Sequence, residues 1–263
     1  MNIITLSTID LSMAAVLVLI LAGLSLWLQL GVTRQILIAG VRTTVQLLLI
    51  GLVLKTLFEN VNLYYMALIA CVMLLLAGRE VMARQTHRFT GLWGFGMGTL
   101  SMFISTFIVT LLALTVIIST EPWYTPQYAI PLLGMMLGNT MTGIALGLER
   151  LTQAAREQRR QIEARLMLGH SANLAINDIR KNAMRLGMMP MINAMAAAGL
   201  VSLPGMMTGQ ILSGTDPLEA VKYQILIMFL ITAGTGFGTV AAVMMAGYRL
   251  FDERQRLRLD RLR

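Results

Sequence analysis

The sequence has little charge and a single cysteine. Asp, Glu, Lys and Arg make up 13% of its 263 residues, whereas soluble domains carry about 25%. In addition, 56% of the residues are hydrophobic. Together these two values exclude an ordinary soluble domain. The lone Cys71 excludes a disulfide bond within the chain, and we expect it to pack as a small apolar side chain.

Several motifs of enzyme chemistry are also missing. The phosphate-binding pattern GxxxxGK[ST] does not occur, so the chain is not expected to hydrolyse ATP by that route. No Ser/His pair, paired Asp or His-rich zinc pattern lies in the apolar segments, which argues against an intramembrane enzyme. His87 and His170 are expected to be ordinary surface histidines, and no residue is assigned as a metal ligand.

Long apolar runs dominate what is present. A transmembrane helix needs about 20 mainly apolar residues. Six charge-free intervals of that size lie between Asp10 and Arg34, Glu59 and Arg79, Arg88 and Glu121, Glu121 and Glu149, Arg185 and Asp216, and Lys222 and Arg249. A seventh, between Arg34 and Lys55, contains only Arg42. The sequence therefore predicts an all-α membrane protein with about seven transmembrane helices in one permease domain, residues 1–263.

The basic residues predict the orientation. With the N-terminus outside and the C-terminus in the cytoplasm, all of the 21 Lys and Arg residues except Arg42, Lys55 and Lys222 fall in cytoplasmic loops. The net charge of +8 is then a topology signal, and these loops can also attract anionic lipid headgroups. A nucleic-acid partner is not expected.

The longest polar stretch, residues 149–185, is predicted to be a cytoplasmic helical segment. It lacks proline and is rich in good helix formers, so it should continue the preceding helix out of the membrane. Gly169 is expected to end a helix in the left-handed conformation, and Ser171 to cap the next one.

This segment contains a candidate docking motif. Glu163, Ala164 and Gly169 resemble the short coupling motif by which permeases of ATP-binding-cassette (ABC) transporters bind their ATPase, with Leu168 and His170 beside the glycine. The alternative is a solvated pair of amphipathic helices with no partner.

The interval from Arg185 to Asp216 has an unsuitable length. Its 30 residues would span about 45 Å as one helix, against a hydrocarbon core of about 30 Å. A break at Pro204 and Gly205, with a second irregularity near Pro190, would resolve the mismatch. Irregular backbone at membrane depth is tolerated where protein or a water-filled cavity satisfies it. We therefore expect a hinge or part of a pathway here.

The same region resembles the FetB family of bacterial ABC permeases. The sequence PLLGMMLGNTM at residues 131–141 matches that family's fifth-helix pattern, and residues 199–225 match its signature. The fitting positions are Ser202, Leu203, Pro204, Gly205, Met206, Met207, Gly209, Gly214, Asp216, Pro217, Tyr223 and Gln224.

The resemblance implies a partner, a location and a cargo. It implies a homodimeric permease of the bacterial inner membrane that pairs with two copies of a FetA-like ATP-binding subunit, which would bind ATP and Mg²⁺. It also implies iron export and relief of iron-linked oxidative stress. The Leu-Pro of the importer coupling pattern is replaced by Lys181 and Asn182, which argues against an importer.

The residues leave the substrate open. No carboxylate is predicted inside the bilayer, so a buried cage for a hard iron ion is not expected. The 21 methionines would suit copper, although they also suit adaptable packing. Other metals, a metal chelate, a nucleotide sugar and an ATP-independent carrier remain alternatives. The candidate pathway residues are Arg42, Gln46, Asn139 and Asn193.

Overall fold

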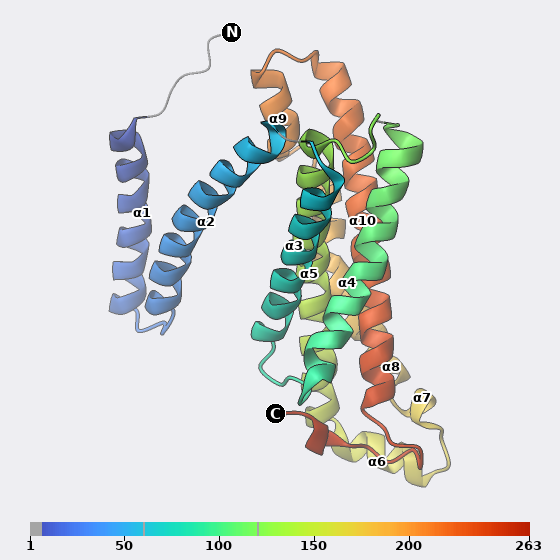
Figure 1. Cartoon of the computed structure of the whole chain (residues 1–263). Coiled ribbons are helices and arrows are strands. Elements are labelled where there is room, and N and C mark those ends of the chain that lie inside the picture. Colours follow the sequence, from blue (N-terminus) through green and yellow to red (C-terminus); the bar gives the residue numbers. More distant parts are fainter. Residues whose placement is uncertain (1–6, 60, 120) are drawn as a thin grey trace. The chain divides into compact units, whose positions relative to one another are not determined.

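The computed structural model of the chain describes residues 7–59, 61–119 and 121–263. Within these ranges the regular elements are helices, apart from isolated bridges between single residues (Figure 1). The all-α prediction is confirmed. The chain divides into two compact units: unit 1 is Met1–Asn62 with Leu212–Gly214, and unit 2 is Leu63–Ile211 with Thr215–Arg263. Whether residues 1–263 act as one permease domain stays a prediction.

Unit 1 is a hairpin of α1 (Thr8–Trp27) and α2 (Thr33–Glu59). Ser7 caps α1 in a capping box with Asp10. Gly31 has a φ of +72° in the turn between the helices, a conformation that favours glycine. The hydroxyl of Thr33 donates to the hydroxyl of the buried Ser25 at 3.0 Å, which holds the base of the hairpin together.

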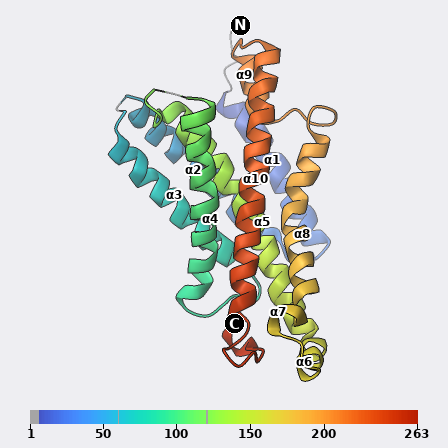
Figure 2. The ribbon, with the colours of Figure 1, turned by 90° about the vertical axis from the view of Figure 1, so that its right-hand side faces the viewer.

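Unit 2 is a helical bundle built around α5 (Pro126–Glu157) and α10 (Pro217–Arg249). α10 lies between α4 (Leu92–Leu112) and α8 (Asn177–Ala197), with α5 behind it (Figure 2). α3 (Leu63–Ala83) packs on α4 and α5, and a π-helical turn, Ala113–Ile117, extends α4. The remaining helices are α6 (Arg159–Met167), α7 (Ala172–Ala175) and α9 (Gly205–Leu212).

In the described residues, six helices are long and apolar enough to cross a membrane: α1, α2, α3, α4 with its π-helical turn, α5 and α10. The expected count of seven is not confirmed. The interval from Arg185 to Asp216 is divided between the second half of α8 and α9, with residues 198–204 between them. α5 and α10, with 32 and 33 residues, would each be about 50 Å long and would extend beyond a bilayer core of about 30 Å.

Glycine allows α5, α8 and α10 to pack closely. A Cβ atom added at Gly143 of α5 would lie 2.6 Å from Cγ2 of Thr235 and 2.9 Å from the carbonyl oxygen of Gly187. A Cβ at Gly147 would meet Val243 at 3.0 Å. A Cβ at Gly138, on the same helix, would meet nothing within 4 Å. Gly143 and Gly147 of α5 are thus points of close helix packing.

We expect Gly143→Ala to destabilise the protein and Gly138→Ala to leave it unchanged or slightly more stable. The added methyl at position 143 must displace backbone, and overpacking of this kind costs about 1–3 kcal/mol. At position 138 alanine only gains helix propensity. Thermal unfolding in detergent measures the difference, with a loss of at least about 3 °C expected for Gly143→Ala alone. Equal melting temperatures for the two variants would contradict this packing.

Candidate coupling and pathway sites

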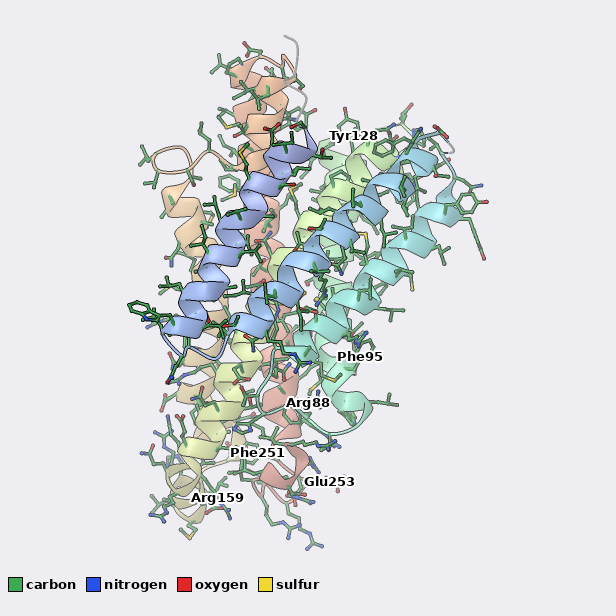
Figure 3. The ribbon with its side chains drawn as sticks, turned by 90° about the vertical axis from the view of Figure 1, so that its left-hand side faces the viewer. Arg88, Phe95, Tyr128, Arg159, Phe251 and Glu253 are labelled. Carbon is green, nitrogen blue, oxygen red and sulfur yellow. The ribbon has the colours of Figure 1, made fainter. Side chains whose placement is uncertain are left out.

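One end of unit 2 carries most of its basic residues, and we call it the basic end. It comprises residues 84–91, 150–181 and 249–263. Arg88, Arg159, Phe251 and Glu253 lie toward this end, and Tyr128 lies toward the opposite one (Figure 3). The predicted cytoplasmic segment forms much of it, because α5 continues to Glu157 and is followed by α6 and α7.

The turn after α6 has the predicted geometry. Gly169 has a φ of +87°, and its amide donates to the carbonyl of Leu166 at 3.0 Å. Ser171 caps α7 by accepting a hydrogen bond from the amide of Leu174 at 3.4 Å. Ile162, 1% exposed, anchors α6 in the core of unit 2. The turn is therefore held by a buried side chain on one side and a cap on the other.

The residues assigned to coupling lie in different surroundings. Glu163 pairs with Arg159 across one helical turn at 2.7 Å. Ala164 and His170 are exposed, and Leu168 ends α6 with 79% of its surface exposed. Met167, which our sequence reasoning missed, is 83% exposed. We call residues 167–170 the coupling tip.

Residues 250–263 form a C-terminal strap across the basic end. The backbone groups of Arg88 and Arg263 bond to each other in both directions, with N···O distances of 3.2 and 2.8 Å. The amide of Thr90 donates to the carbonyl of Arg261 at 2.9 Å. Leu262 and Phe89, 5% and 3% exposed, belong to the same core cluster. The strap therefore fixes the loop between α3 and α4.

The strap also contacts the coupling segment. Arg156 of α5 donates to the carbonyl of Leu262 at 3.3 Å. The amide of Ala172, which begins α7, donates to the side-chain oxygen of Gln255 at 2.8 Å. One short segment thus joins α5, α7 and the α3–α4 loop.

Ion pairs inside the strap use two of its three acidic residues. Asp260 accepts two hydrogen bonds from Arg258 at 2.8 and 2.9 Å, and these lower the pKa of Asp260 to about 2. The backbone amide and guanidinium of Arg256 bond Asp252 and lower the pKa of that carboxyl as well. Both carboxylates are therefore ionised and paired at neutral pH.

The predicted helix break is present. α8 ends at Ala197, and the chain turns at Gly199, whose φ is +83°. The amides of Val201 and Ser202 donate to the carbonyl of Ala197 at 3.0 and 3.2 Å. α9 begins at Gly205. The break is a hydrogen-bonded turn, so its backbone groups are largely satisfied.

Pro204 lies at a helix start in this segment, whereas Pro190 lies inside a helix. The carbonyl of Pro204 accepts from the amide of Thr208 at 3.1 Å, so Pro204 leads directly into α9. Met206 and Met207 are half-buried. α8 continues through Pro190 as a helix, so the predicted irregularity there is wrong. Proline is tolerated within a helix when neighbouring groups satisfy the freed carbonyl.

The structure does not assign the four candidate pathway residues to one site. Arg42 and Gln46 are exposed on α2 of unit 1. Asn139 and Asn193 are exposed on α5 and α8 of unit 2. The side-chain amide of Asn139 donates to the carbonyl of Met135 on its own helix at 2.8 Å.

A set of buried hydroxyls was missed in the sequence. Thr106 on α4, Thr140 on α5, and Thr235 and Thr239 on α10 are almost wholly buried, and within the described residues their hydroxyl oxygens make no hydrogen bond. We call these four residues the hydroxyl seam. An unpaired buried hydroxyl costs about 1–3 kcal/mol. The sequence signal was weak, because threonine is common in apolar helices.

The part of the chain that the structure describes contains no group of three or more His, Cys, Asp or Glu side chains placed to hold a metal ion. His87 is half-buried and His170 is exposed, both at the basic end. Cys71 is a free thiol and is exposed on α3, so it is not packed within this chain.

Comparison with known proteins places the chain among membrane proteins. Residues 8–251 match the model of the Uncharacterised protein family (UPF0014). The UPF0014 membrane protein slr1647 of Synechocystis is 42% identical over 88% of each chain. The Probable iron export permease protein FetB of Escherichia coli is 28% identical over 97% of this chain and 96% of its own. The Protein ALUMINUM SENSITIVE 3 of Arabidopsis thaliana is 30% identical over 93% and 87%. No solved structure matches the chain.

Proposed function

The chain belongs to the UPF0014 family of membrane proteins, and we propose that it is the permease subunit of an ABC transporter. Two copies would form the membrane part, and two copies of a FetA-like ATP-binding subunit would supply the energy. The partner subunits would bind ATP and Mg²⁺, since the GxxxxGK[ST] pattern is missing from this sequence. The expected location is the bacterial inner membrane.

The distribution of charge supports a cytoplasmic basic end. The strap and the coupling segment bring many arginines of unit 2 to one end. Under the positive-inside rule this end faces the cytoplasm. The N-terminus would lie outside if the segment formed by α8 and α9 crosses the membrane together with the six long helices.

The coupling tip is the observation that carries the proposal. Met167 and Leu168 are exposed apolar side chains on a helix that Ile162 anchors in the core. They lie in a strongly polar segment outside the candidate spans. An anchored apolar tip is suited to insertion into a groove of another protein. The ATPase subunit is the occupant that the coupling-motif resemblance implies.

Iron is the proposed cargo, and it rests on the FetB relative. The hydroxyl seam offers oxygen atoms between α4, α5 and α10, the ligand type that hard cations prefer. Neutral hydroxyls would bind such an ion weakly, and weak binding allows a transported ion to leave the site again. Another metal, a chelate or a nucleotide sugar is the alternative cargo.

Transport into inside-out vesicles tests the proposal. The chain is co-expressed with its ATPase subunit, and ATP-dependent accumulation of iron, copper and a nucleotide sugar is measured in parallel. We expect iron to accumulate and accumulation to stop with a hydrolysis-deficient ATPase. Accumulation of another substrate alone would replace the iron assignment. Transport by the chain without its ATPase would instead establish a carrier.

We expect Gly169→Val to lower transport at least tenfold while the complex still hydrolyses ATP. A β-branched residue at a φ of +87° is strained by roughly 1–2 kcal/mol, and relief of this strain would reorient the coupling tip. Gly214→Val is the matched control, because Gly214 has a φ of +97° in the turn between α9 and α10 and also has open space around it. The measurement is substrate moved per ATP hydrolysed. An unchanged ratio in Gly169→Val would refute the coupling role of this turn.

A further inference from the structure

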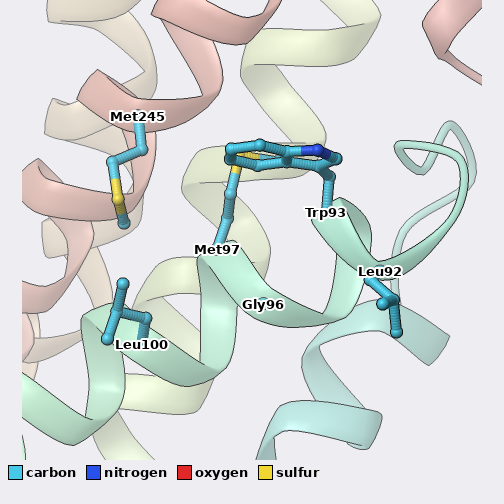
Figure 4. Close-up of a pocket in the computed structure, with 6 residues that line it drawn as sticks. All are labelled: Leu92, Trp93, Gly96, Met97, Leu100 and Met245. Carbon is cyan, nitrogen blue, oxygen red and sulfur yellow. The ribbon is translucent and has the colours of Figure 1, made fainter.

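An apolar groove lies between α4 and α10 at the basic end. Its lining residues are Leu92, Trp93, Gly96, Met97, Leu100 and Met245, and its volume is about 280 Å³. Met245 reaches from α10 toward Leu100, and the ring of Trp93 lies beside Met97 (Figure 4). The groove is therefore made by two helices that each qualify as a membrane span.

We expect the groove to lie at the level of a membrane boundary. The candidate span that contains α4 runs for 26 residues from Leu92 to Ile117, which is about 39 Å against a core of about 30 Å. Its first turn lies beside Arg249 and follows Arg88 in the chain, so we expect this turn near the interface between headgroups and acyl chains. Trp93 is 55% exposed there, and tryptophan prefers this interface.

Basic residues lie at one end of the groove. The guanidinium of Arg249 stacks 4.7 Å from the ring centre of Trp93. The backbone bonds between Arg88 and Arg263 bring two further basic residues next to the start of α4.

Two of the three acidic residues of the strap are engaged elsewhere, and the third, Glu253, is exposed. Asp252 pairs with Arg256, and Asp260 pairs with Arg258. Their negative charges are therefore largely compensated, and the arginines at the groove favour an anion.

We propose that this groove is a binding site for an anionic phospholipid. One acyl chain lies along the surface between Leu100 and Met245, and the phosphate faces Arg249. The apolar lining favours a lipid over a soluble anion, because free phosphate would gain nothing from covering it. The charge beside Trp93 favours an anionic lipid over a zwitterionic one, and one arginine near a membrane surface gives about a fivefold preference.

The three tryptophans of the chain allow a direct test. Trp27→Phe with Trp123→Phe leaves Trp93 as the sole tryptophan. The full chain is reconstituted in phosphatidylcholine vesicles. A small and constant fraction of the lipid is either phosphatidylglycerol or phosphatidylcholine with brominated acyl chains, which quench tryptophan fluorescence. At equal mole fraction, we expect brominated phosphatidylglycerol to occupy the site about fivefold more often. Equal quenching by both lipids would overturn the proposal.

Three variants and one competitor locate the effect. Arg249→Gln is expected to remove the preference, and Arg254→Gln, which removes an exposed charge from the same end, to retain it. Gly96→Leu should expel the acyl chain without disturbing α4, because a Cβ there meets nothing within 4 Å. Retained preference in Gly96→Leu or Arg249→Gln would contradict the site. Relief of quenching by millimolar inorganic phosphate would indicate a soluble-anion site and would also overturn the proposal.

Discussion

Replacing Met167 and Leu168 together with Asp is expected to weaken binding of the ATPase subunit by at least about 100-fold. Burying each apolar side chain contributes about 1.5–3 kcal/mol, and the two together correspond to this loss of affinity. Both side chains are largely exposed in the chain, so the variant should fold normally. Co-purification and titration of the ATPase subunit in detergent measure the effect.

A matched control for this variant lies at the opposite end of unit 2. Leu218 is 71% exposed in the first turn of α10, where an acidic residue is compatible with the helix. Leu218→Asp should leave ATPase binding unchanged. If the double variant bound the ATPase as tightly as the parent chain, the coupling tip would not be the docking surface, whichever substrate is transported.

Leu262→Ala is expected to cause a large loss of stability. Leu262 is 5% exposed and belongs to the core cluster that contains Phe89, Phe251 and Ile162. Truncation of a buried leucine costs about 2–5 kcal/mol, which corresponds to a fall of about 5–15 °C in the melting temperature for a chain of this size. Arg263→Ala keeps the backbone bonds to Arg88 and removes only an exposed side chain.

Thermal unfolding of the two variants side by side compares the loss of a buried side chain with the loss of an exposed one in the same segment. The Arg263→Ala variant should melt within about 2 °C of the parent chain. If Leu262→Ala had the same melting temperature as Arg263→Ala, the strap would be a loosely attached tail rather than part of the core.

Features governed by local chemistry were predictable from the sequence. The charge-free intervals indicated the long apolar helices, because span length depends only on composition and rise per residue. Gly169, Ser171 and the Pro204–Gly205 break were found because each has a specific backbone preference. The predicted irregularity at Pro190 failed because tertiary packing can maintain a helix through a proline.

Features that depend on tertiary contacts were not found. The strap was read only as five basic residues, although Leu257, Leu259 and Leu262 alternate with them and pack on the core. Met167 was passed over because nothing in a sequence distinguishes an exposed methionine from a buried one. The hydroxyl seam lies on three helices that pack against one another, and no local sequence pattern predicts this packing.

The close contact of Gly143 with Gly187 has a mechanical consequence. A Cβ on either glycine would come within 3 Å of the other's carbonyl oxygen, so the two backbones are in direct contact. Sliding of α8 along α5 would drive side chains into backbone, so we expect the two helices to move together as one rigid body. α5 leads into α6 and the coupling tip, and α8 ends at Ala197, where the broken segment begins. A displacement of the coupling tip would therefore reach the broken segment without a chain of intermediate side-chain rearrangements.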